Sequence, residues 1–340
     1  MIIIDGSIGG GQILRTSLSL SALTQKPFKI KNIRSKRSNP GLQNQHLTSV
    51  NSIAQICNAK VIGNILNSKE LEFFPNKVVP GNYKFDIGTA GSTTLVLQTL
   101  LPPLIFDTNQ QSNVSVIGGT ANPLAPPALE IKEVFLWHLK NLGIDINLEI
   151  EKEGFYPKGG GKIKVKINPA EILNEIKLQT SDKSKHYDET NVIAICSKEL
   201  KEKNVAKRMI DGFKLNFPVK ENIKTKEIYV ETLSPGCYLH ANYNYGYIYK
   251  IGMTILGEKT KKSEDVGKEC AIKLLEEMKS GENLDSFTAD QLLIYLAIKG
   301  SGKIRTSKIT DHIKTNIETI EKFLDVKFTI KDNIIECKAK

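Results

Sequence analysis

His312 is the residue of this 340-residue chain whose type and position best suit covalent chemistry. It follows Thr310 and Asp311, both favoured N-cap residues, and leads an apolar stripe that begins at Ile313. The pattern predicts that His312 lies in the first turn of a helix, at the positive end of its dipole. A neutral imidazole beside a bound phosphate is suited to act as a nitrogen nucleophile. The alternative is a surface histidine near a helix cap.

A second polar pair, Asp290 and Gln291, opens another predicted helix. These side chains could hold a metal ion, a nucleotide ribose or the nucleophilic histidine. The competing interpretation is that Asp290 only caps the helix and stabilises its dipole.

Glycine-rich loops at residues 9–11 and 118–120 lie beside predicted strands and helices. Glycine allows backbone N–H groups to approach a phosphate closely. Neither loop has the ending of a P-loop or the full dinucleotide fingerprint, so tight turns remain an equal interpretation.

Basic residues gather early in a chain of formal net charge +10. Arg15 lies in the first predicted helix, and Arg34 and Arg37 follow the next strand. The planar arginine fork suits phosphate oxygens, although a solvated basic face would look the same. The phosphate bound by these arginines could be that of an RNA end. No RNA-binding motif with interleaved aromatic residues lies nearby, so we expect recognition of an RNA end rather than of a base sequence.

The sequence gives little indication of membrane targeting, disulfide bonds or a zinc site. The first residues lack the pattern of a signal peptide, and no apolar run is long enough to span a bilayer, so we expect a cytoplasmic protein with no membrane partner. The five cysteines are far apart and lack C-x-x-C spacing, which favours buried thiols over disulfides or a zinc site.

Three segments of the chain repeat one pattern, and these must position the polar residues. Each has a polar loop, a helix, a strand, a second helix and then alternating strands. The loops begin at Asp5, Asp86 and Asp285, and the apolar stripes of the second helices include Val50, Phe135 and Ile317. We expect three such units to pack their sheets around a shared core.

The third unit is delayed by an insertion with its own pattern. Strands are predicted at 192–196, 228–233, 238–243 and 247–256, and helices at 199–213 and 264–278. The predicted fold is mixed α+β and α/β: a catalytic domain of three repeats formed by residues 1–177 and 282–340, and a small inserted α/β domain at 178–281.

Ordered motifs along the whole chain resemble those of the RNA 3′-terminal phosphate cyclase family. They lie at 5–15, 34–46, 88–98, 118–127, 154–161, 289–292 and 312–317. The resemblance is weakest in the insertion. It implies repeats similar to those of enolpyruvyl transferases and the C-terminal domain of bacterial translation initiation factor three, with a thioredoxin-like inserted domain.

The resemblance also implies a phosphoric-ester-forming ligase that works in three steps. His312 attacks the α-phosphorus of ATP and releases pyrophosphate. The AMP then passes to the 3′-terminal phosphate of an RNA. The neighbouring 2′-OH finally attacks that phosphorus, expelling AMP and leaving a 2′,3′-cyclic phosphate. Mg²⁺ or Mn²⁺ is the implied metal.

Site residues are carried over by motif. The implied nucleotide-site positions are Gln98, Pro126, Phe287, Thr288, Ala289, Asp290 and Gln291. Pro126 and Phe287 would sandwich the adenine, and Asp290 would orient His312 or stabilise its protonated form. The implied contacts to the RNA terminal phosphate are Arg15, Arg34, Arg37 and Gln45.

One departure concerns the metal. Many family members carry a glutamate before the triple glycine, whereas this loop is shorter and has Ile8 there. The metal ligands are therefore unknown, with Asp5 one possible carboxylate.

Two rival functions are a non-catalytic cyclase-like ribosome-assembly protein, which would lack the nucleophilic histidine, and a small-molecule transferase built on the same repeat. The RNA substrate, the oligomeric state and the role of the insertion stay open.

Overall fold

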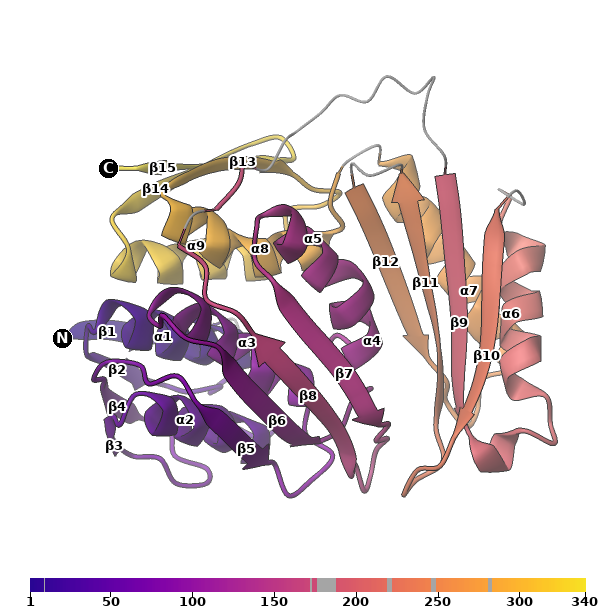
Figure 1. The fold of residues 1–340 in the computed structure, drawn as a ribbon, viewed down its shortest axis with the longest axis horizontal. Helices are drawn as coiled ribbons and strands as arrows, with labels where there is room; N and C mark the ends of the chain where they lie inside the picture. The colour runs from indigo at the N-terminus through magenta and orange to yellow at the C-terminus, as the bar shows by residue number, and fades with distance from the viewer. Residues whose placement is uncertain (9, 172, 176–187, 219–221, 246–248, 281–282) are drawn as a thin grey trace.

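The computed structural model describes residues 1–340 apart from residues 9, 172, 176–187, 219–221, 246–248 and 281–282 (Figure 1). The first repeat runs from β1 to β4, and its sheet has the strand order β1-β2-β4-β3, with β1 and β2 parallel. Its elements are β1 (Ile2–Asp5), α1 (Gly11–Thr24), β2 (Phe28–Lys31), α2 (Asn44–Ile56), β3 (Lys60–Ile62) and β4 (Leu71–Phe74).

The second repeat has the same topology, with strand order β5-β6-β8-β7 and a parallel β5–β6 pair. Its elements are β5 (Asn82–Asp86), α3 (Thr93–Phe106), β6 (Ser112–Gly118), α4 (Ala128–Glu130), a π-turn (Ile131–Phe135), α5 (Leu136–Asn141), β7 (Ile146–Lys152) and β8 (Gly161–Ile167). The predicted single second helix is thus interrupted by a π-turn. Val134 of this turn packs closely against Gly252 of the insertion. A Cβ added to Gly252 would lie only 2.5 Å from Cγ2 of Val134.

The third repeat is shorter. Its elements are α8 (Ser286–Lys299), β13 (Ser301–Arg305), α9 (Asp311–Phe323), β14 (Val326–Lys331) and β15 (Ile334–Ala339), with strand order β13-β15-β14. A single parallel bridge between Leu284 and Thr306 stands where the other repeats have their first strand pair. The repeated pattern is therefore confirmed, with the first strand of the third unit reduced to that bridge.

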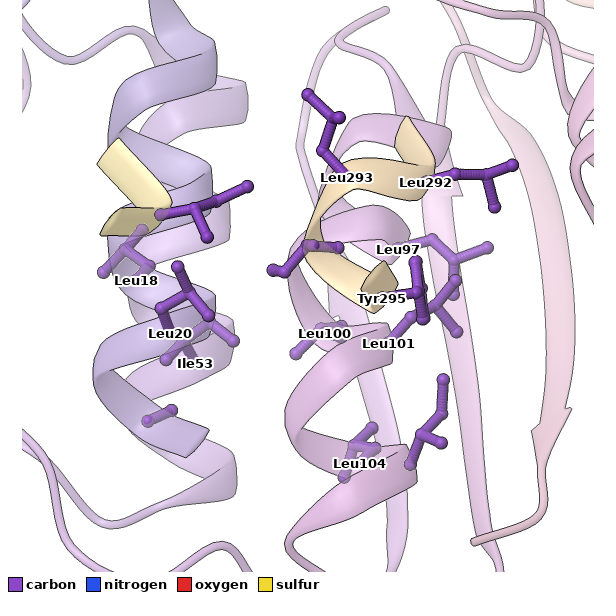
Figure 2. Close-up of a cluster of buried hydrophobic side chains, with 14 of the residues drawn as sticks. Leu18, Leu20, Ile53, Leu97, Leu100, Leu101, Leu104, Leu292, Leu293 and Tyr295 are labelled. Atoms are coloured by element: carbon purple, nitrogen blue, oxygen red, sulfur yellow. The ribbon is translucent and has the colours of Figure 1, made fainter. Parts of the chain in front are cut away.

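The helices of the repeats share one core. α1 packs against α2, α3 and α9, and α8 packs against α9. Buried side chains of the core include Leu18, Leu20, Ile53, Leu97, Leu100, Leu101, Leu104, Leu292, Leu293 and Tyr295 (Figure 2). α3 is buried on nearly every side, which explains why its sequence is apolar all round rather than striped. The first helices of the three repeats have 14 residues each, so their polar starts can meet at one end.

The insertion forms its own sheet and core. Its elements are β9 (Asp188–Ser197), a 3₁₀ turn (Lys198–Leu200), α6 (Val205–Asn216), β10 (Ile223–Val230), β11 (Cys237–Tyr245), β12 (Tyr249–Leu256) and α7 (Ser263–Lys279). The strand order is β10-β9-β11-β12, and only the β10–β9 pair is parallel. α6 and α7 cover one face of this sheet, and the other face turns toward the second repeat (Figure 1).

Some predicted boundaries in the insertion were wrong. The helix expected at 199–213 starts at Val205, after a 3₁₀ turn, and the strand expected at 228–233 is β10, which starts at Ile223 and ends at Val230. Lysines and threonine at 224–226 hide the alternation of β10, and Ser234 and Pro235 end it in a turn. The junctions at 177/178 and 281/282 lie outside the described residues, so the domain boundaries stay predictions.

The five cysteines are free thiols, and four of them are buried. Among the described residues, no helix combines the length and apolarity needed to span a membrane.

Candidate active site where the first and third repeats meet

His312 lies in the first turn of α9, as the sequence predicts. Thr310 caps the helix, since its Oγ1 accepts a hydrogen bond from the backbone N–H of Ile313 at 3.2 Å. The histidine side chain is exposed. Its Nδ1 lies 2.6 Å from Oε1 of Gln12, the second residue of α1. The imidazole is therefore accessible and is held by a residue of another repeat.

Asp290 is linked to the histidine through Gln12. Its Oδ2 accepts a 2.5 Å hydrogen bond from Gln12 Nε2, and its Oδ1 accepts a 3.0 Å bond from Asn316 Nδ2. Burial raises the pKa of Asp290 to about 6, although Asn316, His312, Gln12 and Arg15 all favour the ionised form. The orienting role of Asp290 stays a prediction. The hydrogen bonds connect Asp290 to His312 through the side chain of Gln12.

Other predicted nucleotide positions lie on α3, α8 and the loop before α4. Gln98 Nε2 donates to Gln291 Oε1 at 2.6 Å, which joins α3 to α8. Thr94 Oγ1 donates to the carbonyl oxygen of Pro126 at 2.7 Å, so α3 also anchors the proline loop. Through these contacts, Gln98, Gln291 and Pro126 gather around α3.

Three implied positions at the start of α8 differ in exposure. Phe287 is 60% exposed, whereas Thr288 and Ala289 are buried. Asp285 caps the helix by accepting bonds from the N–H and the hydroxyl of Thr288, both at 2.7 Å. Phe287 thus presents a ring to solvent while its neighbours fix the helix start, and the adenine sandwich stays a prediction.

A basic hollow lies beside the N-terminus of α1. It has a volume of about 300 Å³ and is lined by Ser7, Ile8, Gly10, Arg34, Lys36 and Arg37. The Nη1 of Arg34 donates to the carbonyl oxygens of Asn39 and Gly41 at 2.6 and 2.8 Å, so this side chain also shapes its own loop. Arg37 is exposed, and its Nη2 would lie 3.1 Å from a Cβ on Gly10. Positive side chains and a helix N-terminus favour an anion here.

His46 is a neutral side chain beside this basic region, and the sequence did not single it out as a candidate site residue. It is buried beside Gly11 and Arg15: a Cβ on Gly11 would lie 2.4 Å from His46 Nε2 and 2.9 Å from Arg15 Nη1. Burial, then Arg15 and Arg34, lowers the pKa of His46 to about 3. Its Nδ1 accepts from the N–H of Gln43 at 3.3 Å, which leaves the ring proton on Nε2. The sequence signal that could have indicated His46 is its position directly after Gln45 in the motif at 34–46.

The remaining predicted phosphate contacts are placed differently. Arg15 is half-buried, and burial lowers its pKa to about 10 against the opposing effect of Asp290, so it stays charged at neutral pH. Gln45 Oε1 accepts from the backbone N–H of Ser92 at 3.0 Å, which ties α2 to the start of α3. Arg15 therefore lies with His46, whereas the Gln45 oxygen points to the second repeat.

The described residues do not fit a protein-bound metal. They contain no group of three or more His, Cys, Asp or Glu side chains arranged to hold an ion. The carboxylate of Asp5 already accepts from the N–H and hydroxyl of Ser7 at 3.0 Å and from Asn32 at 3.2 Å, and these bonds lower its pKa.

Three helix–sheet repeats, one inserted domain and a polar site between repeats define a mixed α/β protein of the RNA-cyclase type. The chain matches the family model described as RNA 3'-terminal phosphate cyclase over residues 7–330. It therefore belongs to the RNA 3′-terminal phosphate cyclase family, which confirms the family, the fold class and the enzyme class expected from the sequence.

Curated relatives bear the same description. The protein named RNA 3'-terminal phosphate cyclase from Sulfolobus acidocaldarius is 41% identical over 339 residues, covering 97% of each chain. The relative of that name from Pyrococcus abyssi is 39% identical, covering 98% of this chain and 96% of its own. The one from Ectopseudomonas mendocina is 38% identical, covering 95% and 93%.

Proposed function

We propose that this protein converts an RNA 3′-terminal phosphate to a 2′,3′-cyclic phosphodiester, using ATP and a covalent AMP adduct on His312. The observation that carries the proposal is the exposed imidazole at the start of α9, fixed by Gln12 beside the basic hollow at the start of α1. The start of α1 thus holds the nucleophile of α9 through Gln12, and Gly10, two residues before Gln12, lines the basic hollow.

The first step is adenylation. A ring nitrogen of His312 attacks the α-phosphorus of ATP, and the bond from that phosphorus to the bridging oxygen breaks as pyrophosphate leaves. The N–H groups and dipole of the α9 N-terminus favour the phosphate that approaches His312. Phe287, exposed on α8, offers a ring face to the adenine.

The second and third steps use the RNA end. A terminal phosphate oxygen attacks the phosphorus of the adduct, the N–P bond breaks, and His312 is regenerated. The 2′-OH then attacks the activated 3′-phosphorus, loses its proton and expels AMP. The 2′-OH is already adjacent to that phosphorus, so ring closure gains a large effective concentration. Arg37, Arg15 and the Nε2–H of neutral His46 would bind the terminal phosphate.

The decisive experiment uses ATP labelled at the α-phosphate. The protein is mixed with labelled ATP and a divalent cation, denatured, and tested for bound label. We expect an acid-labile, alkali-stable phosphoramidate on the wild type and none on His312→Ala. Equal labelling of that variant would refute the assignment of His312.

The main rival is a cyclase-like protein without catalytic activity that acts in ribosome assembly. The presence and exposure of His312 disfavour it. A wild-type protein that takes no label and leaves an RNA 3′-phosphate unchanged would support this rival. A cytoplasmic location and the use of Mg²⁺ or Mn²⁺ remain part of the proposal.

A further inference from the structure

Gln12 bridges two helices of the third repeat from the first turn of α1. Its Oε1 lies 2.6 Å from His312 Nδ1, and its Nε2 donates a 2.5 Å hydrogen bond to Asp290 Oδ2. One amide therefore contacts both the proposed nucleophile on α9 and the half-buried carboxylate on α8.

Asp290 determines which end of the Gln12 amide faces it. An ionised carboxylate only accepts hydrogen bonds, and Asp290 already accepts one from Asn316. Gln12 must present its NH₂ group to Asp290 and its carbonyl oxygen to His312. Because that oxygen can only accept, Nδ1 of the neutral imidazole must carry the ring proton, which leaves the lone pair on Nε2.

Further hydrogen bonds fix the same polarity. Thr16 Oγ1 donates to Asn316 Oδ1 at 2.8 Å, so the Asn316 amide is oriented from α1. Asn316 Nδ2 also donates to the backbone oxygen of Asp290 at 3.1 Å. Reversing either amide would place two donors or two acceptors face to face, and a buried unpaired group costs about 1–3 kcal/mol. Each residue therefore donates to the next in a fixed order, from Thr16 through Asn316 to Asp290 and from His312 through Gln12 to Asp290.

We propose that Gln12 is a positioning residue that selects Nε2 of His312 as the attacking atom. This inference rests on the proposed adenylation of His312. The Nε2 lone pair forms the bond to the α-phosphorus while pyrophosphate leaves with the electrons of the broken P–O bond. The Nδ1 proton stays in place, and its bond to Gln12 strengthens as the ring becomes positively charged. Asp290, behind the amide, supports that charge.

The ring tautomer can be measured without ATP. We would label histidine with ¹⁵N and record long-range ¹H–¹⁵N correlation spectra of the full chain near neutral pH. The chain has five histidines, and comparison with His312→Ala identifies the signal of interest. We expect the Nδ1–H tautomer in the wild type and a shift toward Nε2–H in Gln12→Leu. An Nε2–H tautomer in the wild type, or no change in Gln12→Leu, would overturn the inference.

Adenylation provides the second readout. In single-turnover labelling at saturating ATP, we expect Gln12→Leu to slow the step by about 10- to 100-fold, as is common when a group that orients a reactive side chain is lost. Gln12→Glu keeps an acceptor oxygen opposite Nδ1 and, when protonated, a donor toward Asp290, so it should restore most of the rate and the wild-type tautomer. Gln55→Leu, at an exposed glutamine of α2, is the matched control and should change neither.

The two readouts separate this inference from the proposed function. A wild type that takes no label overturns both the adenylation and the choice of nucleophile. A wild type that is labelled on His312, with a rate that Gln12→Leu leaves unchanged, overturns only the role of Gln12. Circular dichroism and urea unfolding of Gln12→Leu establish that a slower rate does not come from a loss of folded protein.

Discussion

The hydroxyl of Tyr238 donates a 2.7 Å hydrogen bond to Oε1 of Glu153, and this bond joins the insertion to the second repeat. Both side chains are buried, and Thr120 donates to the other carboxylate oxygen. Burial raises the pKa of Glu153, and the hydrogen bonds from Thr120 and Tyr238 oppose that shift. The contact lies in a small apolar cluster that includes Phe155 and Ile195. The insertion is thus docked through a buried polar contact as well as apolar packing.

Tyr238→Phe should lower the free energy of unfolding by about 1–3 kcal/mol, because Glu153 loses a donor inside the interface. Urea unfolding measured on both proteins at one pH would check this. Tyr229→Phe is the matched control, since its hydroxyl accepts from Ala206 N within the insertion. A double-mutant cycle with Glu153→Gln should show coupling for Tyr238 and none for Tyr229. Additive effects for Tyr238 would contradict the interface role.

Asp290 should make stability depend on pH. Its pKa is raised from 3.8 to about 6 in the folded protein, so its contribution is fully present below pH 3.8 and is lost as pH rises through 6. The wild type should lose up to about 3 kcal/mol of unfolding free energy over that window relative to Asp290→Asn. Urea unfolding at several pH values measures the difference, with the exposed Asp311→Asn as the control. If the free energies of unfolding of Asp290→Asn and the wild type change in parallel with pH, the predicted contribution of Asp290 is disproved.

The sequence predicted the elements that local patterns determine. The stripes of α2 and α9 follow from apolar spacing, and the N-cap at Thr310 places His312 correctly because capping depends on neighbouring residues. The resemblance implied that Asp290 orients His312, and the structure links the two side chains through Gln12. It also grouped Arg15, Arg34 and Arg37, which the structure places near the start of α1. These were the parts of the site that motifs could indicate.

The contacts between repeats could not be predicted in the same way. Gln12 and His312 are 300 positions apart, and nothing in local spacing indicates that an amide lies between His312 and Asp290. The burial of His46 likewise arises from tertiary packing against Gly11. The interrupted helix at 131–135 was missed because a π-turn leaves the apolar stripe almost unchanged.

Arg37→Ala should separate RNA use from adenylation. The side chain is exposed and lines the basic hollow, so its loss should reduce the use of an RNA 3′-phosphate by about 10- to 100-fold, the value of a charge-assisted hydrogen bond. Labelling with ATP alone should stay near the wild-type rate. Lys60→Ala, at an exposed lysine of β3, is the control for net charge. An equal loss in both steps would argue against a terminal-phosphate role.

Arg34→Ala should behave differently from Arg37→Ala. Arg34 bonds two carbonyl oxygens of its own loop, so its removal should weaken RNA use more than adenylation and also loosen residues 34–41. Limited proteolysis would detect the loosened loop, and Arg37→Ala should resist cleavage like the wild type. Loop cleavage that is unchanged in Arg34→Ala would show that the two carbonyl contacts are dispensable.

Gly11→Ala tests how closely the start of α1 approaches the basic region. The added Cβ would lie 2.4 Å from Nε2 of buried His46, so the imidazole must move away from Arg15 or the helix start must shift. We expect a loss of about 1–3 kcal/mol in unfolding free energy, typical of overpacking, and a larger loss of RNA use than of adenylation. Gly81→Ala is the matched control, because its Cβ would meet Tyr83 at an ordinary 3.5 Å and should be tolerated. If Gly11→Ala matches Gly81→Ala in stability and RNA use, His46 is not held against the backbone as the structure places it, and its proposed contact with the terminal phosphate fails with it.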